Sequence, residues 1–422
     1  MKKCTKTLTA VIVSLVACIT AFSCAHTEAG KSDSIIKSAV KSDTRSDVND
    51  ISFYLPSPTI EPYPTSGDEQ VRNIIFCIGD GMGVGQVALA RMKAAGAAGL
   101  LYMERMPVSG FIRTHSANAL VTDSAAAGTA LASGVKTNNG IIGMTPDGTG
   151  SQTILEAAKD KGMATGLVVT STISHATPAA FASHVMSRKM QDKIAEQLIA
   201  NKVNVLFGGG EEYFLPKSSC KSKRNDEKNL IEQAKEAGYL YIRTAEELET
   251  IHHTHTLGLF QLGSLTTVAP EPSLAELTAK AIDILSRQRK GGEKQGFFLM
   301  VEGSQIDWAC HDNDAARTIR QTLLFDQAVK AAIDFAKKDK NTLVVVTADH
   351  ETGGLTVKSG NMKCDALGIS WSTGGHSAMP VPVYAFGPKA DIFAGTYDNT
   401  EVPRKFAGLL GITPFPKALP DE

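Results

Sequence analysis

The sequence predicts an α/β protein, a three-layer sandwich with a central, mostly parallel sheet flanked by helices. Two observations support this prediction. Short, continuous apolar runs recur from Val71 onward, and segments with helical patterning lie between them. Strands that are apolar throughout are buried on both faces, and their alternation with helices is typical of a parallel sheet covered on both sides.

The individual elements follow from these runs and from local start signals. The predicted strands are Ile74–Ile78, Gly166–Thr170, Val203–Phe207, Phe297–Val301, Leu343–Thr347 and Val383–Phe386. The predicted helices are Thr153–Lys161, Lys189–Asn201, Leu274–Arg289, Asp314–Lys338 and an alanine-rich helix that starts near Ser124 and ends near Gly134. Two helices begin with a capping box, Thr153 with Glu156 and Ser273 with Glu276, in which side chains satisfy free amides of the first turn.

The first 23 residues are expected to be a secretory signal peptide. Three lysines precede an apolar run, Leu8–Phe22, that ends in small residues. This run of about 15 residues is short for a membrane span, which needs roughly 20. A small residue before Cys24 also fits a bacterial lipobox, which would make Cys24 an acylated anchor; simple cleavage nearby is the alternative. The mature protein is therefore expected in the periplasm or attached to a membrane as a lipoprotein.

Three further segments are predicted from composition. Residues 24–70 are rich in Ser, Asp and Lys and then in Pro, which favours a flexible linker. The folded domain is expected over 71–415, with an inserted substructure at about 211–256 that consists of a basic loop, a helix, a strand and a helix. An exported protein lies in an oxidising compartment, so a Cys220–Cys364 disulfide and two free thiols both remain open.

The overall charge excludes some classes of partner. The chain has 43 Lys+Arg against 44 Asp+Glu, and 43% of its residues are hydrophobic. Nucleic acids and anionic membranes select basic surfaces, so a nucleic acid is not expected as a specific partner. The composition is that of a globular protein.

Acidic residues and histidines follow several of the predicted strands, and His376 lies shortly before the predicted strand Val383–Phe386. These residues are Asp80, Glu302, Asp307, His311, Asp349, His350 and His376. Each alone has an ordinary structural explanation, such as a helix cap or a surface ion pair. Together they converge on the carboxyl edge of the sheet, where ligands bind in open parallel sheets. Crowded carboxylates repel, and divalent metal ions offset that repulsion; mixed Asp/His ligation suits zinc, and carboxylates suit magnesium. The pattern predicts a polynuclear metal site.

Ser124 is the candidate nucleophile. In the first turn of the alanine-rich helix, free amides and the helix dipole favour a phosphate group. The alternative is that Asp123 or Ser124 is only an N-cap. Arg188 could grip two phosphate oxygens with its guanidinium, or it could be a surface charge.

Five motifs, in this order, resemble the alkaline phosphatase family over roughly residues 71–415. They are Gly79-Asp80-Gly81-Met82-Gly83, Thr122-Asp123-Ser124-Ala125-Ala126, His175-Ala176-Thr177-Pro178-Ala179-Ala180, Val301-Glu302-Gly303 and Thr347-Ala348-Asp349-His350. The resemblance implies hydrolysis of small phosphate monoesters at two zinc ions and a third metal ion. It implies that Ser124 becomes phosphorylated, that Arg188 binds the phosphoryl group, and that water then hydrolyses the phosphoserine. Dimerisation is common in the family and is an open expectation here.

The same resemblance assigns the metal ligands. Asp307, His311 and His376 would hold the first zinc, and Asp80, Asp349 and His350 the second. Asp80, Thr177 and Glu302 would hold the third ion, magnesium, with zinc or cobalt as competing occupants. His175 stands where some members carry Asp, and Trp308 where some carry Lys; these two and Asp123 would support the site without binding metal. The change at His175 weakens the expectation of magnesium.

Other functions remain as alternatives. Ser124 is followed by alanines rather than the Pro and Arg that sulfatases need, and phosphodiesterase relatives usually carry Thr as the nucleophile. Intracellular phosphoglycerate mutases share the metal core but do not fit a signal peptide. A non-catalytic phosphate-binding protein is the alternative from a different class. The histidines at 252, 253 and 255 are interpreted as part of a solvated loop.

Overall fold

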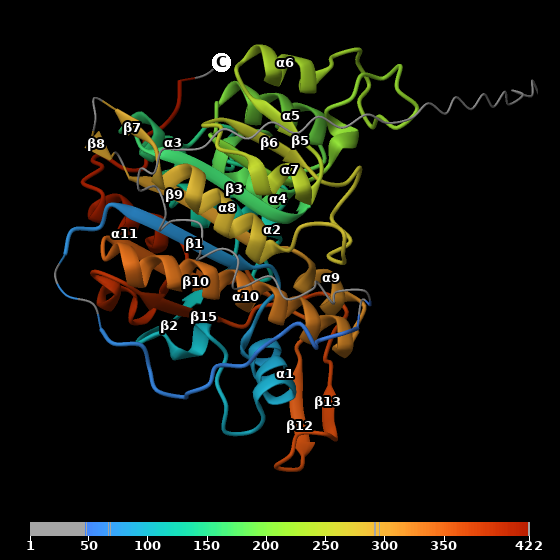
Figure 1. The fold of residues 1–422 in the computed structure, drawn as a ribbon, viewed down its shortest axis with the longest axis vertical. Coiled ribbons are helices and arrows are strands. Elements are labelled where there is room, and N and C mark those ends of the chain that lie inside the picture. Colours follow the sequence, from blue (N-terminus) through green and yellow to red (C-terminus); the bar gives the residue numbers. More distant parts are fainter. Residues whose placement is uncertain are drawn as a thin grey trace, which may run out of the picture. The chain divides into compact units, whose positions relative to one another are not determined.

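The computed structural model describes residues 47, 49–65, 67, 69–290, 293–294 and 296–420. Its core is a 10-stranded sheet, which confirms the predicted α/β fold (Figure 1). In spatial order the strands are β16 (Gly395–Asp398), β2 (Val108–Arg113), β15 (Val381–Phe386), β10 (Thr342–Thr347), β1 (Asn73–Gly79), β9 (Phe297–Gly303), β3 (Ala164–Thr172), β4 (Val205–Gly209), β6 (Thr256–Leu259) and β5 (Leu240–Ile242). All six predicted strands are present.

The register of the central strands brings their carboxyl ends level. Ile78 of β1 lies opposite Thr347 of β10 on one side and Glu302 of β9 on the other. Every residue of these three strands is buried, because both faces of the sheet are covered. In the described sheet only β15 runs antiparallel, between β10 and β2.

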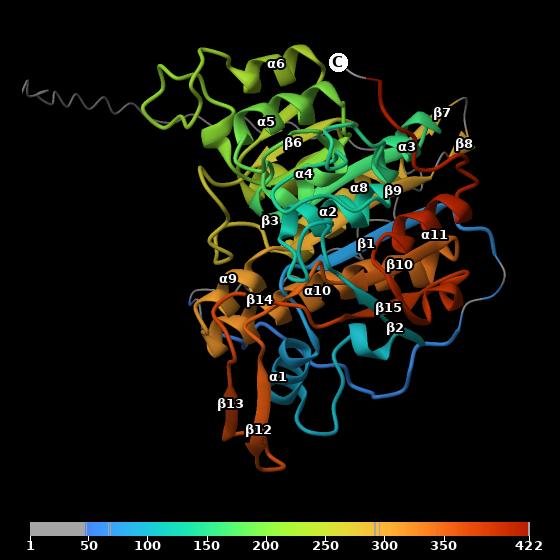
Figure 2. The same ribbon diagram turned by 180° about the vertical axis from the view of Figure 1, so that it is seen from behind.

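Helices cover both faces of the sheet. Figure 1 shows α8 (Leu274–Ser286) and α10 (Ala315–Asp339) in front of it, and Figure 2 shows α2 (Ser124–Ser133), α3 (Ile154–Asp160), α4 (Ala176–Ala182) and α11 (Glu401–Leu409) over the opposite face. The other helices are α1 (Val84–Ala95), α5 (Gln191–Ala200), α6 (Leu230–Glu236), α7 (Ala245–Thr250) and α9 (Gln305–His311). Both predicted capping boxes form, at the starts of α3 and α8. None of the described helices is both long and apolar enough to cross a membrane.

The helix, strand and helix predicted within 211–256 are present, and one further region was not predicted. Residues 211–256 contain α6, β5 and α7, and β5 pairs with β6, so this segment continues the central sheet at its edge. A hairpin that was not predicted, β12 (Thr356–Gly360) with β13 (Leu367–Ser370), extends away from the sheet (Figure 1). Four short strands complete the described set: β7 (Arg289–Lys290) pairs with β8 (Glu293–Lys294), and β11 (Glu351–Thr352) pairs with β14 (His376–Ser377).

The described part of the predicted linker packs on the domain. Tyr54 is 6% exposed and its hydroxyl donates a hydrogen bond to Asp326 at 2.6 Å. Tyr63 is also buried, and Arg105 lies over its ring and donates to the carbonyl of Glu61. These residues have no regular secondary structure, but they are held by aromatic side chains, so the prediction of a flexible segment is wrong for this part.

Cys220 and Cys364 do not form a disulfide in the structure. Cys220 is exposed in the loop before α6, whereas Cys364 is buried near the tip of the β12–β13 hairpin, and both are free thiols. In Figure 1, α6 lies at the top of the view and the β12–β13 hairpin at the bottom. The predicted signal peptide and Cys24 lie outside the described residues and stay predictions.

Candidate active site

The predicted site residues meet at the carboxyl edge of the sheet. Asp80 follows β1, Glu302 lies at the end of β9, and Asp349 follows β10. His376 precedes β15, and because β15 runs antiparallel its start lies at this same edge. Ser124 begins α2 after the long loop that leaves β2.

Three carboxylates are buried in this cluster with oxygens that have no protein partner. Asp80, Glu302 and Asp349 are each 0% exposed. Both carboxylate oxygens of Asp80, Oε1 of Glu302 and Oδ2 of Asp349 accept no hydrogen bond. Burial and the neighbouring carboxylates raise the pKa of Asp80, and burial raises the pKa of Glu302 to about 7. Buried, unpaired carboxylates are costly unless a cation neutralises them, so this cluster fits metal ions.

One group of ligand atoms is formed by Asp307, His311 and His376, as predicted. Asp307 and His311 are on α9, one helical turn apart, and His311 Nε2 lies 3.3 Å from Asp307 Oδ2. His311 Nδ1 faces the carbonyl of Gly374 and His376 Nδ1 that of Thr122, both at 2.8 Å. With Nδ1 donating, both Nε2 atoms face the carboxylate and lie 3.1 Å apart.

The pKa values of this group follow from the shared carboxylate. Hydrogen bonding to Asp307 raises the pKa of His311 to about 9, and it raises the pKa of His376 although burial opposes the shift. Burial also opposes the shift of Asp307, but the two histidines hold the pKa of that carboxyl well below its usual range. Nitrogen and oxygen atoms that converge in this way are the donors zinc prefers.

His350 stands at the centre of the predicted second zinc site. Its Nε2 lies 3.2 Å from Ser124 Oγ, 3.2 Å from Asp349 Oδ2 and 3.5 Å from Asp80 Oδ1. Its side chain is 0% exposed, and burial lowers its pKa. Asp349 Oδ1 accepts from the amides of Gly81 and His350, which leaves Oδ2 directed to the site. Asp80, Asp307 and His350 also come within ligand distance of one another, so Asp307 lies between the two predicted zinc sites.

The third group differs from the prediction in one member. His175 lies within ligand distance of Asp80 and Glu302, whereas the sequence analysis predicted that it would support the site without binding metal. Its Nδ1 is buried without a hydrogen-bond partner, and so is the hydroxyl of Thr177, the predicted ligand in the first turn of α4. Burial lowers the pKa of His175 to about 4, which keeps the imidazole neutral and able to bind a metal. Trp308 packs edge-on against this ring, with centroids 5.9 Å apart.

Asp123 holds both the start of α2 and the Arg188 side chain. Its Oδ1 accepts from the amide of Ala126 as the N-cap of α2, so Ser124 begins the helix. Its Oδ2 accepts from Arg188 Nη1 at 3.1 Å, and both oxygens accept from the amide of Gly140. The guanidinium is 27% exposed, and its Nη2 also lies 3.4 Å from His175 Nε2, so Arg188 is held between Asp123 and His175.

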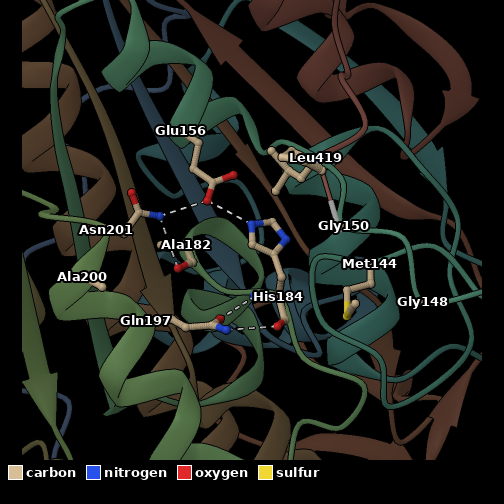
Figure 3. A pocket seen from close by; sticks show the side chains of 11 residues that line it. Met144, Gly148, Gly150, Glu156, Ala182, His184, Gln197, Ala200, Asn201 and Leu419 are labelled. Carbon is tan, nitrogen blue, oxygen red and sulfur yellow. Dashed lines mark hydrogen bonds and ion pairs between the residues drawn. The ribbon is translucent and has the colours of Figure 1, made fainter. Parts of the chain in front are cut away.

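A pocket of about 590 Å³ lies away from this cluster and contains none of the predicted site residues (Figure 3). Glu156 Oε1 accepts from Asn201 and faces His184 Nε2, and Gln197 pairs with the backbone of His184. These side chains hydrogen-bond to one another. They brace the segment that leads from α4 to Arg188, so we interpret the pocket as structural.

Sequence reasoning missed the residues that hold the ligands in place. Thr352 and Gln86 are buried behind the cluster, and Gln86 Nε2 donates to Glu351 Oε1 and to the Thr352 carbonyl. One signal was present: Thr352 follows His350 by two residues, and alternate side chains of an extended chain point to the same side.

Comparisons with known proteins agree with this geometry. A family model for alkaline phosphatase matches residues 71–368, more than half of the chain. The chain belongs to the alkaline phosphatase family. It is 45% identical over 311 residues to Alkaline phosphatase 4 of Bacillus subtilis (strain 168), a match that covers 70% of this chain and 64% of that protein. It is 35% identical over 433 residues to Alkaline phosphatase 3 of the same organism, covering 82% and 91%.

Solved structures show the same fold. The alkaline phosphatase from the Antarctic bacterium TAB5 is 34% identical, with a TM-score of 0.74, and the match covers 82% of this chain and 100% of that one. Two variants of that enzyme, in which a histidine is replaced by Glu or by Asp, are described with magnesium bound in its M3 site.

Proposed function

We propose that this protein hydrolyses phosphate monoesters to an alcohol and inorganic phosphate through a phosphoserine intermediate at Ser124. One observation carries the proposal. Ser124 Oγ, at the first residue of α2, lies 3.2 Å from His350 Nε2, beside buried carboxylates that each have at least one oxygen without a hydrogen-bond partner. A nucleophilic hydroxyl, an anion-binding helix start and metal-ligand atoms are thus in one place.

The donor atoms fit two zinc ions. Asp307, His311 and His376 would hold the first, and Asp80, Asp349 and His350 the second, with Asp307 close to both. Two bound zinc ions would activate the Ser124 hydroxyl and stabilise charge on the entering and leaving oxygens.

The chain's own residues would bind and orient the phosphoryl group. A phosphoryl group held by the first amides of α2 and by the Arg188 guanidinium would present its phosphorus to Ser124 Oγ. Asp123 fixes both parts, because it caps α2 and pairs with Arg188. Preorganised donors of this kind stabilise the charge of the transition state without reorganising during the reaction.

The third site would be formed by Asp80, Glu302 and Thr177, as in the magnesium assignment, with His175 now within ligand distance. Magnesium prefers oxygen ligands, whereas imidazole suits zinc or cobalt. We therefore infer that zinc or cobalt competes effectively with magnesium at this site. The TAB5 variants, in which an acidic residue replaces a histidine and magnesium is bound, support this inference by analogy.

Hydrolysis of an aryl phosphate monoester tests the proposal. Full activity is expected in the zinc-loaded protein, and loss is expected after chelation. Ser124→Ala should lower kcat by about 10³-fold or more, because the nucleophile is removed. Ser133→Ala is the matched control, since Ser133 is buried in the same helix and donates only to the Thr129 carbonyl. Full activity in Ser124→Ala or in the chelated protein would refute the mechanism, and faster hydrolysis of an aryl diester would favour a phosphodiesterase.

A further inference from the structure

Thr352 connects the ligands of the two proposed zinc sites. Its side chain is 0% exposed. Its hydroxyl lies 2.5 Å from Asp307 Oδ1, a ligand of the first site, and 3.3 Å from His350 Nδ1, a ligand of the second. In the described part of the chain, no other side chain hydrogen-bonds to both of these ligands.

The direction of both hydrogen bonds follows from chemistry. The ionised Asp307 carboxylate only accepts, so the Thr352 hydroxyl must donate to it. A hydroxyl that donates its single proton can only accept from a second partner, so His350 Nδ1 must carry the ring proton. The lone pair of His350 is then on Nε2, the atom that faces Ser124 Oγ and Asp80. Thr352 therefore fixes the metal-binding tautomer of His350.

The backbone of Thr352 is itself fixed on three sides. Its amide donates to the carbonyl of Gly81 at 3.1 Å, and its carbonyl accepts from Gln86 Nε2 at 2.7 Å. In the β11–β14 pair it lies opposite His376, another ligand of the first site. The hydroxyl thus has little freedom to move, and its position is set by the same segments that carry the ligands.

We propose that Thr352 is a positioning residue that orients ligands of both metal sites through one hydroxyl group. The proposal rests on the zinc-dependent function above. If Thr352 were only a packing residue, valine would replace it without effect, because valine has nearly the same shape and lacks only the hydroxyl. Outer hydrogen bonds to metal ligands typically change metal affinity by about 10-fold to 100-fold.

The experiment is a zinc titration of the metal-free full-length protein in competition with a chromophoric chelator. Three variants are compared with the wild type: Thr352→Val, Thr352→Ser and Thr278→Val. Thr278 is the matched control, because its hydroxyl is buried in α8 and donates only to the Leu274 carbonyl at 2.7 Å. Thermal unfolding of the metal-free forms shows whether each variant folds.

The proposal expects Thr352→Val to bind both tightly held zinc ions about 10-fold to 100-fold more weakly. Thr352→Ser, which keeps the hydroxyl, should bind zinc like the wild type, and so should Thr278→Val. Zinc affinity in folded Thr352→Val equal to that of the wild type would overturn the proposal, as would an equal loss in Thr278→Val. If Thr352→Val does not fold, the Thr352→Ser variant decides: zinc affinity like that of the wild type supports the proposal, and a loss of about 10-fold or more overturns it. A wild-type protein that binds no zinc would instead refute the proposed function itself.

Discussion

Gly81 is the position where one added methyl group should damage the site most. It has a φ of +73°, and a Cβ built there would lie 2.8 Å from the Asp307 Cα atom and 2.9 Å from Thr352 Oγ1. Both neighbours belong to the metal site, and the first is backbone that cannot rotate away. In Gly81→Ala, therefore, either the Asp80–Gly81 turn or the start of α9 must move.

The size of the effect follows from two contributions. A left-handed backbone costs a residue with a side chain about 1 to 2 kcal/mol, and overpacking a rigid contact costs about 1 to 3 kcal/mol. Relieving the overlap requires a shift of roughly 0.5 Å or more, since ordinary carbon contacts begin near 3.5 Å. A displacement of this order at reacting groups lowers kcat/KM by about 10-fold to 100-fold. Stability and activity should fall together.

Gly238→Ala separates the two contributions. Gly238 has a φ of +92° and no heavy atom within 4 Å of its added Cβ, and it follows α6, away from the site. This control should lose only the backbone contribution, about 1 to 2 kcal/mol, and keep its activity. Unfolding midpoints and kcat/KM for an aryl phosphate are measured for both variants. Unchanged kcat/KM in Gly81→Ala, or an equal loss in Gly238→Ala, would refute the steric argument.

Three further outcomes can be measured. Burial raises the pKa of Asp326 to about 6, so the native state holds this proton more tightly and stability falls as pH rises from about 4 to about 6. In Asp326→Asn this decline should be absent. The stability difference between variant and wild type, measured by denaturant unfolding of the metal-free proteins, should therefore change by about 2 kcal/mol between about pH 4.5 and about pH 7.5. Parallel stability profiles of the two proteins would contradict the prediction. Arg188→Ala should lower kcat/KM by about 10²-fold or more, because the two charge-assisted hydrogen bonds proposed between its guanidinium and the phosphoryl group are lost. An effect smaller than that of a surface arginine variant such as Arg287→Ala would exclude phosphoryl binding by Arg188. Removal of metal should lower the unfolding midpoint, because Asp80, Glu302 and Asp349 then repel one another, and zinc should restore it; a midpoint insensitive to zinc would contradict the metal assignment.

The core of the fold could be predicted from sequence because burial on both faces leaves a strong signal. The strands β1, β9 and β10 are continuous apolar runs, and the chemistry-bearing residues directly follow them. Level carboxyl ends then force Asp80, Glu302 and Asp349 together. The alanine-rich helix and its end at Gly134 were also predicted, because glycine commonly ends a helix in a left-handed conformation. In the structure Gly134 has a φ of +72°.

Other features depend on contacts between distant segments and leave no local signal. Strand β12 is mostly exposed and has one large apolar residue, Val357, so it gives little strand signal. The buried contact of Tyr54 with Asp326 joins residues 272 positions apart, so a Pro-rich segment looked like a free linker. The approach of His175 to Asp80 and Glu302 likewise depends on how α4 is placed against β9. Thr352 acts through its hydroxyl on two ligands from different elements, and only their three-dimensional arrangement shows it.

The most direct measurement of the proposed mechanism is the covalent state of Ser124 during turnover. The protein is mixed with an excess of a phosphate monoester, quenched in acid, digested and examined by mass spectrometry. We predict phosphate on the peptide that contains Ser124, and none on that peptide in Ser124→Ala. Continued hydrolysis with no phosphate on Ser124, or with phosphate on a different residue, would contradict the mechanism.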